Sequence, residues 1–154
     1  MQDDPIVIVG AARTPMGGFQ GSLSDVTAPE LGGVAIRAAV ARAGVKPEDI
    51  DDVVMGLCLF AGLKQAPARQ AAHYGGLSWD TGCTTLSKMC GSAMKATMLA
   101  HDNILAGSHD VMIAGGMESM TNAPYILPRA RQGYRLGHGD QVNDHMFLDG
   151  LEDA

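Results

Sequence analysis

The feature that most constrains the fold is a regular alternation of short β-branched runs with helical segments, from residue 5 to about residue 116. Strands are predicted at 6–9, 52–56, 83–86 and 111–114. Capping and stop signals predict helices at about 27–44, 67–74 and 91–106. Such an alternation predicts a layered α/β fold with a mostly parallel sheet and right-handed crossovers.

Composition adds a packing expectation. The chain of 154 residues, the size of one ordinary domain, has 20 glycines and many alanines but only 5% aromatic residues. Backbones are therefore expected to pack closely through small side chains rather than around large rings. The segment 91–106 has few polar positions, so we expect that helix to be buried on most sides.

The character of the sequence changes after Gly116. No hydrophobic period is sustained over 117–154, and charge is segregated: three arginines (Arg129, Arg131 and Arg135) precede a stretch, 140–154, with five acidic residues and no Lys or Arg. A charge run usually marks a solvated segment, but a loop this long is usually functional or disordered. Both readings stay open.

Several classes of function are disfavoured. A net charge of -6 argues against nucleic acid or an anionic membrane as the main partner, and no apolar run approaches the length that crosses a bilayer. Asp3 and Asp4 lie where a secretory signal would be positive, so we expect a cytoplasmic protein, or one in a reducing organelle. The chain has no dinucleotide-binding, P-loop or serine-hydrolase motif.

Neither a disulfide framework nor a metal centre is expected. The three cysteines have no Cys-x-x-Cys spacing. His138 and His145 lie in an acidic tail and are expected to be solvated rather than metal ligands. Cys58 and Cys83 fall in or next to predicted strands and are expected to be core residues.

Cys90 is the strongest candidate for chemistry. It lies at a strand-to-helix junction, in the segment Lys88-Met89-Cys90-Gly91-Ser92. The unpaired N–H groups and dipole of a helix N-terminus favour a thiolate over a thiol, and the same N–H groups are candidates for stabilising an oxyanion. An inert buried cysteine is the alternative, and position alone does not decide between them.

Five segments, in order and at compatible spacing, resemble the N-terminal part of the thiolases, the acyl-CoA C-acyltransferases of the acetoacetyl-CoA type. They are Ala12–Pro15, Gln65–Ala72, Lys88–Ser92, Ala114–Met120 and Asp149–Leu151. Two departures from the family pattern occur, Ala93 after Cys-Gly-Ser and Cys58-Leu59-Phe60 before Ala-Gly. Neither removes the nucleophile.

The resemblance implies a thiolase N-terminal α/β domain over 1–118 and the start of a CoA-binding and oligomerisation loop domain over 119–154. It implies that Cys90 forms an acyl-enzyme thioester, for Claisen condensation of two acyl-CoA molecules or for thiolysis of a 3-ketoacyl-CoA. Leu151 is the one residue matched to a CoA contact. No cofactor is implied beyond the CoA thioester substrates, and a homo-oligomer, a dimer of dimers, is expected.

The resemblance covers only the first half of a thiolase. The activating Gly-His-Pro histidine and the second, basic cysteine of the family belong to the other half, and no histidine here precedes a proline. Gly137-His138 is not assigned a catalytic role. The chain alone is therefore expected to be incomplete for turnover, and the alternative is a non-catalytic thiolase-like fragment that acts as an association module.

Overall fold

The computed structural model describes residues 6–138 and 141–153, and its centre is a three-stranded parallel sheet. The strands are β1 (Asp52–Gly56), β2 (Gly82–Leu86) and β3 (Met112–Gly116), in the order β2-β1-β3. Gly56 pairs with Leu86 on one side and with Gly116 on the other. The three strands therefore end level, along one edge of the sheet.

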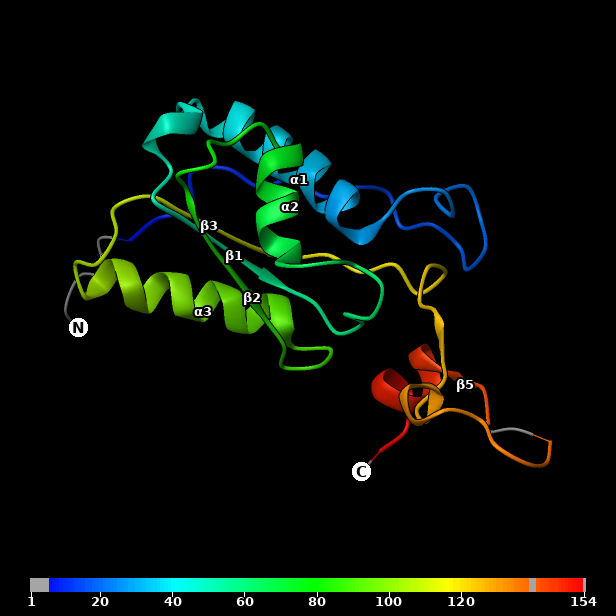
Figure 1. The fold of residues 1–154 in the computed structure, drawn as a ribbon. Helices are drawn as coiled ribbons and strands as arrows, with labels where there is room; N and C mark the ends of the chain where they lie inside the picture. Colours follow the sequence, from blue (N-terminus) through cyan, green and yellow to red (C-terminus); the bar gives the residue numbers. More distant parts are fainter. Residues whose placement is uncertain (1–5, 139–140, 154) are drawn as a thin grey trace.

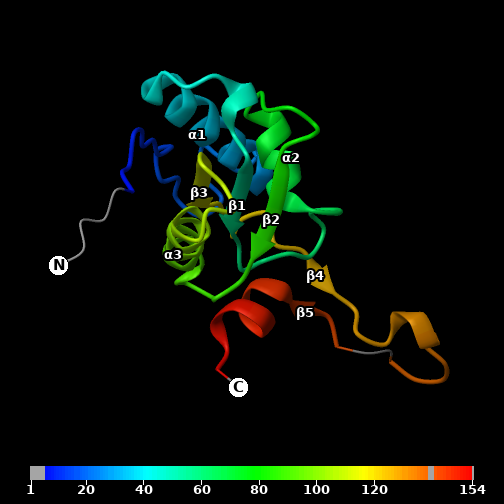
Figure 2. The same cartoon turned by 90° about the vertical axis from the view of Figure 1, so that its left-hand side faces the viewer.

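Helices cover both faces of this sheet. Figure 1 shows α1 (Ala28–Ala43) and α2 (Pro67–Tyr74) on one face and α3 (Ser92–Leu105) on the other, and the rotated view in Figure 2 shows the same layers. The predicted layered, parallel α/β architecture is confirmed.

The bounds of α1 follow from its sequence. Thr27 and Glu30 form a capping box in which the Thr27 N–H and hydroxyl both donate to the Glu30 carboxylate, at 2.8 and 2.7 Å. These bonds lower the pKa of Glu30. Gly44 ends the helix at φ 68°, a left-handed conformation that favours glycine. Both predicted ends of this helix are confirmed.

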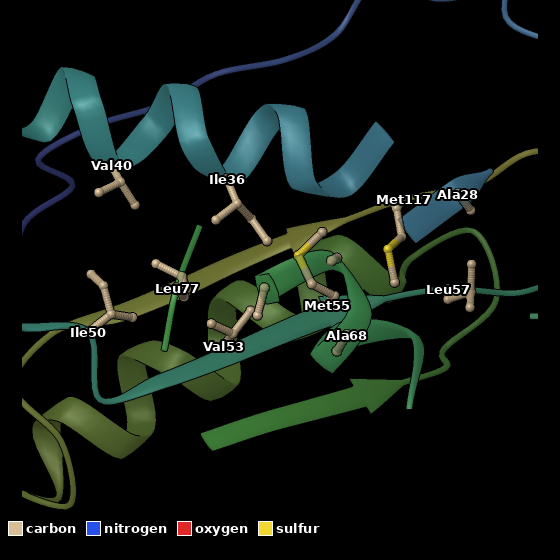
Figure 3. Close-up of a cluster of buried hydrophobic side chains, with 12 residues drawn as sticks. Ala28, Ile36, Val40, Ile50, Val53, Met55, Leu57, Ala68, Leu77 and Met117 are labelled. Atoms are coloured by element: carbon tan, nitrogen blue, oxygen red, sulfur yellow. The ribbon is translucent and has the colours of Figure 1, made fainter. Parts of the chain in front are cut away.

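The hydrophobic core lies between the sheet and the α1–α2 layer (Figure 3). Val53 of the central strand is fully buried, and Ile36 and Val40 of α1 point toward it. α1 also approaches its neighbours closely, since a Cβ on Gly32 would lie 2.8 Å from the Met117 sulfur. Close packing through small residues is thus confirmed for this layer.

The opposite layer is thinner. α3 buries only Ser92, Ala96 and Ala100, whereas the Met94 and Met98 side chains are 72% and 54% exposed. The expectation of burial on most sides is corrected: the sheet covers one face of the helix, and no other element in 6–138 or 141–153 covers the opposite face.

The predicted N-terminal strand is wrong. Residues 6–10 form no strand, and Val7, Ile8 and Val9 are mostly exposed. The segment follows α1 instead: Arg42 donates from Nη1 to the Ala11 carbonyl at 2.6 Å. β-branched residues alone do not make a strand, because a strand also needs a hydrogen-bonding neighbour.

Beyond β3 the chain has little regular structure, as predicted. β4 (Tyr125–Ile126) and β5 (Asn143–Asp144) form a short antiparallel pair, and a 3₁₀ turn (Ala130–Gln132) lies in the exposed excursion between them. A π-helical segment (Met146–Leu151) then returns toward the sheet edge at which β1, β2 and β3 end (Figure 2). The boundary at 118/119 stays a prediction.

Candidate functional site

The site is organised by close contact between the ends of the strands and the start of α3. A Cβ on Gly56 would lie 2.5 Å from the Ser92 carbonyl carbon and 2.6 Å from the Ala93 nitrogen. A Cβ on Gly116 would lie 2.8 Å from the Ala93 Cβ. The first turn of α3 therefore rests directly on the ends of β1 and β3, which fixes where the preceding turn emerges.

That preceding turn carries Cys90, which is exposed. Met89 takes a left-handed backbone conformation, at φ 48°, uncommon for a residue with a side chain. Ser92 holds the turn: its hydroxyl donates to the Met89 carbonyl at 2.5 Å and accepts from the Lys88 N–H at 2.8 Å. Sequence reasoning gave Ser92 no role, although it belongs to the Cys-Gly-Ser motif.

The expected oxyanion contacts require a correction. The Gly91 N–H donates to the Lys88 carbonyl and the Ser92 N–H to the Met89 carbonyl, each at 3.0 Å. Both groups are engaged inside the turn. These two N–H groups, from the two residues that follow Cys90, are therefore not available to an oxyanion in this conformation.

Cys90 lies on the wall of a mostly apolar cavity of about 410 Å³. Four segments line it: the loop after β1, the turn before α3, the segment after β3 and the π-helical turn. Leu151 is far from Cys90 in the sequence but lines the same cavity, and the roles of both residues stay predictions. The lining is rich in sulfur and includes Met89, Met117, Met120 and Met146.

Glu118 fixes one wall of the cavity and was missed at the sequence level. Its Oε2 accepts from the Cys58 N–H at 2.8 Å and its Oε1 from the Leu59 N–H at 3.1 Å. A carboxylate that accepts two backbone N–H groups holds a loop firmly. The available signal was its position, two residues after the Gly-Gly end of β3 in the quoted motif.

The two other cysteines have different surroundings. Cys83 is half-buried and packs against the core, as predicted, and burial raises the pKa of its thiol. Cys58 is also half-buried, but it lines the cavity, so its assignment to the core is wrong. Burial raises the pKa of the Cys58 thiol, and the neighbouring Glu118 carboxylate raises it further.

The expectation for His145 is also corrected. It is buried rather than solvated, with 5% of its surface exposed. Its Nδ1 donates to the Asp149 carboxylate at 2.6 Å, and its Nε2 accepts from the Ala61 N–H at 3.2 Å. His145 therefore ties the π-helical turn to the loop after β1. His138 is exposed, as expected.

Within 6–138 and 141–153, no group of three or more His, Cys, Asp or Glu residues could hold a metal ion. None of the helices in that part of the chain combines the length and the apolar character needed to cross a bilayer.

The family model of the thiolase N-terminal domain matches residues 6–154. Acetyl-CoA acetyltransferase 1 of Arabidopsis thaliana is 51% identical over 154 residues, which are 100% of this chain and 37% of that protein. An acetyl-CoA acetyltransferase of Cupriavidus necator is 51% identical over 149 residues, which cover 97% of this chain and 38% of its own length.

Among solved structures, the Acat5 thiolase of Ascaris suum in complex with coenzyme A superposes with a TM-score of 0.90 at 35% identity, over 96% of this chain and 38% of that one. The chain thus spans well under half the length of the relatives that it matches. On its sequence and its fold, the chain belongs to the thiolase family, of which it carries the N-terminal domain.

Proposed function

We propose that Cys90 is the nucleophile of an acyl-CoA C-acyltransferase reaction, in a thiolase of which this chain forms the N-terminal part. The observation that carries the proposal is the exposed thiol of Cys90 on the wall of an apolar cavity, at a strand-to-helix junction. Relatives named acetyl-CoA acetyltransferase, and a related thiolase solved with coenzyme A, support acyl-CoA as the substrate class.

The reaction proceeds in two transfers. The Cys90 thiolate attacks the carbonyl carbon of an acyl-CoA, the carbon–sulfur bond to CoA breaks, and CoA leaves as a thiolate that takes up a proton. A second acyl-CoA loses a proton next to its carbonyl, and its carbanion attacks the thioester on Cys90. The 3-ketoacyl-CoA then leaves and the Cys90 thiolate is restored; thiolysis is the reverse.

The cavity supplies the contacts around the reacting carbon. Its apolar lining excludes water from the acyl group, which protects the thioester from hydrolysis. Leu151 contacts the CoA portion from the wall formed by the π-helical turn. The groups that deprotonate Cys90 and the second substrate are assigned to the part of a thiolase beyond this chain, because no histidine here precedes a proline.

The nucleophile is tested by incubating the 154-residue chain with acetyl-CoA and measuring its intact mass. One acetyl group is expected on Cys90 in the native chain and in the control variant Cys83→Ser, and none in Cys90→Ser. An adduct on Cys58 or Cys83 in the native chain would contradict the assignment. Robust thiolysis of acetoacetyl-CoA by the purified chain would instead show that the chain is complete for turnover.

A second candidate function is an association module that performs no chemistry. The exposed apolar face of α3, with Met94 and Met98, favours it, because such a surface usually binds another protein surface. A homo-oligomer is expected under both candidates, so oligomeric state does not separate them. Absence of any Cys90 acetyl adduct, with the chain folded and oligomeric, would favour the association module.

A further inference from the structure

The candidate cavity holds a second thiol that the proposed reaction does not use. Cys58 and Cys90 come from different segments, the loop after β1 and the turn before α3, and both line the same cavity. The third cysteine, Cys83, packs against the core on β2 and is not among the residues that line it. Two of the three thiols therefore face one space.

The strand register brings these two segments together. Gly56 and Leu86 are direct partners on the neighbouring strands β1 and β2, and the Leu57 N–H donates to the Leu86 carbonyl at 3.0 Å. Neighbouring strands lie about 4.8 Å apart. Cys58 follows Gly56 by two residues, and the tight turn closed by the Gly91 N–H on the Lys88 carbonyl folds Cys90 back toward the same strand end.

The two thiols differ in their exposure and in their neighbours. Cys90 is exposed, so a small oxidant reaches it directly, whereas Cys58 is half-buried beside Glu118. Burial raises the pKa of the Cys58 thiol, and the neighbouring Glu118 carboxylate and Cys90 raise it further. An accessible cysteine with a second cysteine beside it is the arrangement of a redox-sensitive pair.

We propose that Cys58 and Cys90 form a peroxide-sensitive thiol pair, in which Cys58 captures oxidised Cys90 as an intramolecular disulfide. In the first step the Cys90 thiol releases its proton, and the thiolate attacks hydrogen peroxide, breaks the O–O bond and becomes a sulfenic acid. The hydroxide that leaves takes up the released proton and becomes water. In the second step the Cys58 sulfur attacks the sulfenic sulfur and its proton leaves with the hydroxyl as water. Two thiols and one peroxide thus give one disulfide and two waters.

The disulfide would protect the nucleophile while stopping the reaction. A sulfenic acid without a nearby thiol is oxidised further to sulfinic and sulfonic acids, which are not reduced by ordinary thiols. A disulfide is reduced by dithiothreitol and so preserves Cys90. This role goes beyond acyl transfer, and it stands whether or not the chain accepts an acyl group.

The test uses the 154-residue chain, limiting hydrogen peroxide, N-ethylmaleimide to trap free thiols, and mass spectrometry. Trypsin separates the cysteines, because cleavage after Lys64, Arg69 and Lys88 places each on its own peptide. The native chain and the control Cys83→Ser should lose two trapped thiols and yield one linked 58–90 peptide pair, reversed by dithiothreitol. This linked pair also distinguishes the disulfide from methionine oxidation, which adds oxygen without linking peptides.

Two further variants make the test decisive. Cys58→Ser should form no intramolecular disulfide at limiting peroxide and should lose the Cys90 thiol irreversibly when the peroxide is in excess. Cys90→Ser should keep Cys58 reduced at the limiting peroxide concentration. The proposal is overturned if the native chain gives no 58–90 peptide pair, if the linked pair includes Cys83, or if Cys58→Ser protects Cys90 as well as the native chain does. Acetylation of Cys90 in Cys58→Ser, measured in parallel, reports on the proposed function separately.

Discussion

Gly56→Ala should displace the turn that carries Cys90, and the structure sets the size of the effect. The added Cβ would lie 2.5 Å from the Ser92 carbonyl carbon and 2.6 Å from the Ala93 nitrogen. Ordinary contact begins near 3.4 Å. Both neighbours are backbone atoms of a helix, so no side-chain rotation relieves the overlap, and α3 has to move away from β1 by about 1 Å.

The energetic cost follows from the contacts that this movement weakens. If the buried face of α3 makes about 50 atom pairs with the sheet, each worth about 0.15 kcal/mol, a gap of about 1 Å removes a quarter to a half of that energy. The expected loss is about 3 kcal/mol in the free energy of unfolding, near the upper end for overpacked sites. A shift of this size is a large fraction of the stability of a small domain.

Urea unfolding of the 154-residue chain measures this loss as a lower midpoint with an unchanged slope. Gly91→Ala is the matched control, a glycine-to-alanine change just before α3. The nearest atom to its added Cβ would be the Lys88 carbonyl oxygen at 3.4 Å, an ordinary contact distance. That variant should change stability by less than about 0.5 kcal/mol. Equal midpoints for Gly56→Ala and Gly91→Ala would refute the argument that the start of α3 rests on the end of β1.

Three further predictions concern polar groups. Glu118→Gln should lower the pKa of the Cys58 thiol, because the Glu118 charge raises it, and the pH profile of Cys58 alkylation measures this change. An unchanged alkylation profile would argue against the contact between Glu118 and Cys58. The variant should also lose about 1.5–3 kcal/mol in the free energy of unfolding, because two backbone N–H groups lose their charged acceptor. Asp51 accepts the backbone N–H groups of Val111 and Asp110, which lower the pKa of its carboxyl from its ordinary value of 3.8. The ionised carboxylate therefore stabilises the fold above pH 3.8, and this stabilisation is lost as the pH falls through the lower pKa of the folded state. Acid unfolding followed by circular dichroism should therefore depend less on pH below about 4 in Asp51→Asn than in the native chain, and parallel curves would contradict this. His145→Leu leaves the Ala61 N–H unpaired, so hydrogen exchange over 141–153 should speed up by about tenfold or more, and unchanged protection there would show that His145 does not anchor the tail.

The sequence predicted an element well wherever the segment contained the residues that start and stop it. The capping box at Thr27, the left-handed Gly44 and the proline at the start of α2 bound their helices as expected. The run 6–9 failed because strand formation depends on a neighbour, and periodicity does not report whether one is present. The apolar character of α3 likewise predicts that its surface packs against other parts of the protein, but it does not identify those parts.

The candidate site was predicted only in part, for the same reason. Cys90 was identified from its position before a helix, and Leu151 from a motif, but neither pattern indicates that the two line one cavity. Cys58 and His145 were misjudged because burial and hydrogen-bond partners depend on segments far away in the chain: Glu118 lies beside Cys58, and Ala61 faces His145.

The sequence by itself determined the alternation of strands and helices, the caps, the nucleophile candidate and, through five ordered motifs, the thiolase resemblance. These are properties of neighbouring residues, which share a backbone and therefore interact in any conformation of the chain. The tertiary structure alone decided that the three strands end level, that Gly56 and Gly116 admit the start of α3, and that Cys58 joins Cys90 at one cavity. Contacts of this kind join residues far apart in the chain, 60 positions for Cys58 and Glu118 and 84 for Ala61 and His145. They exist only after the chain has folded and excluded water between these residues.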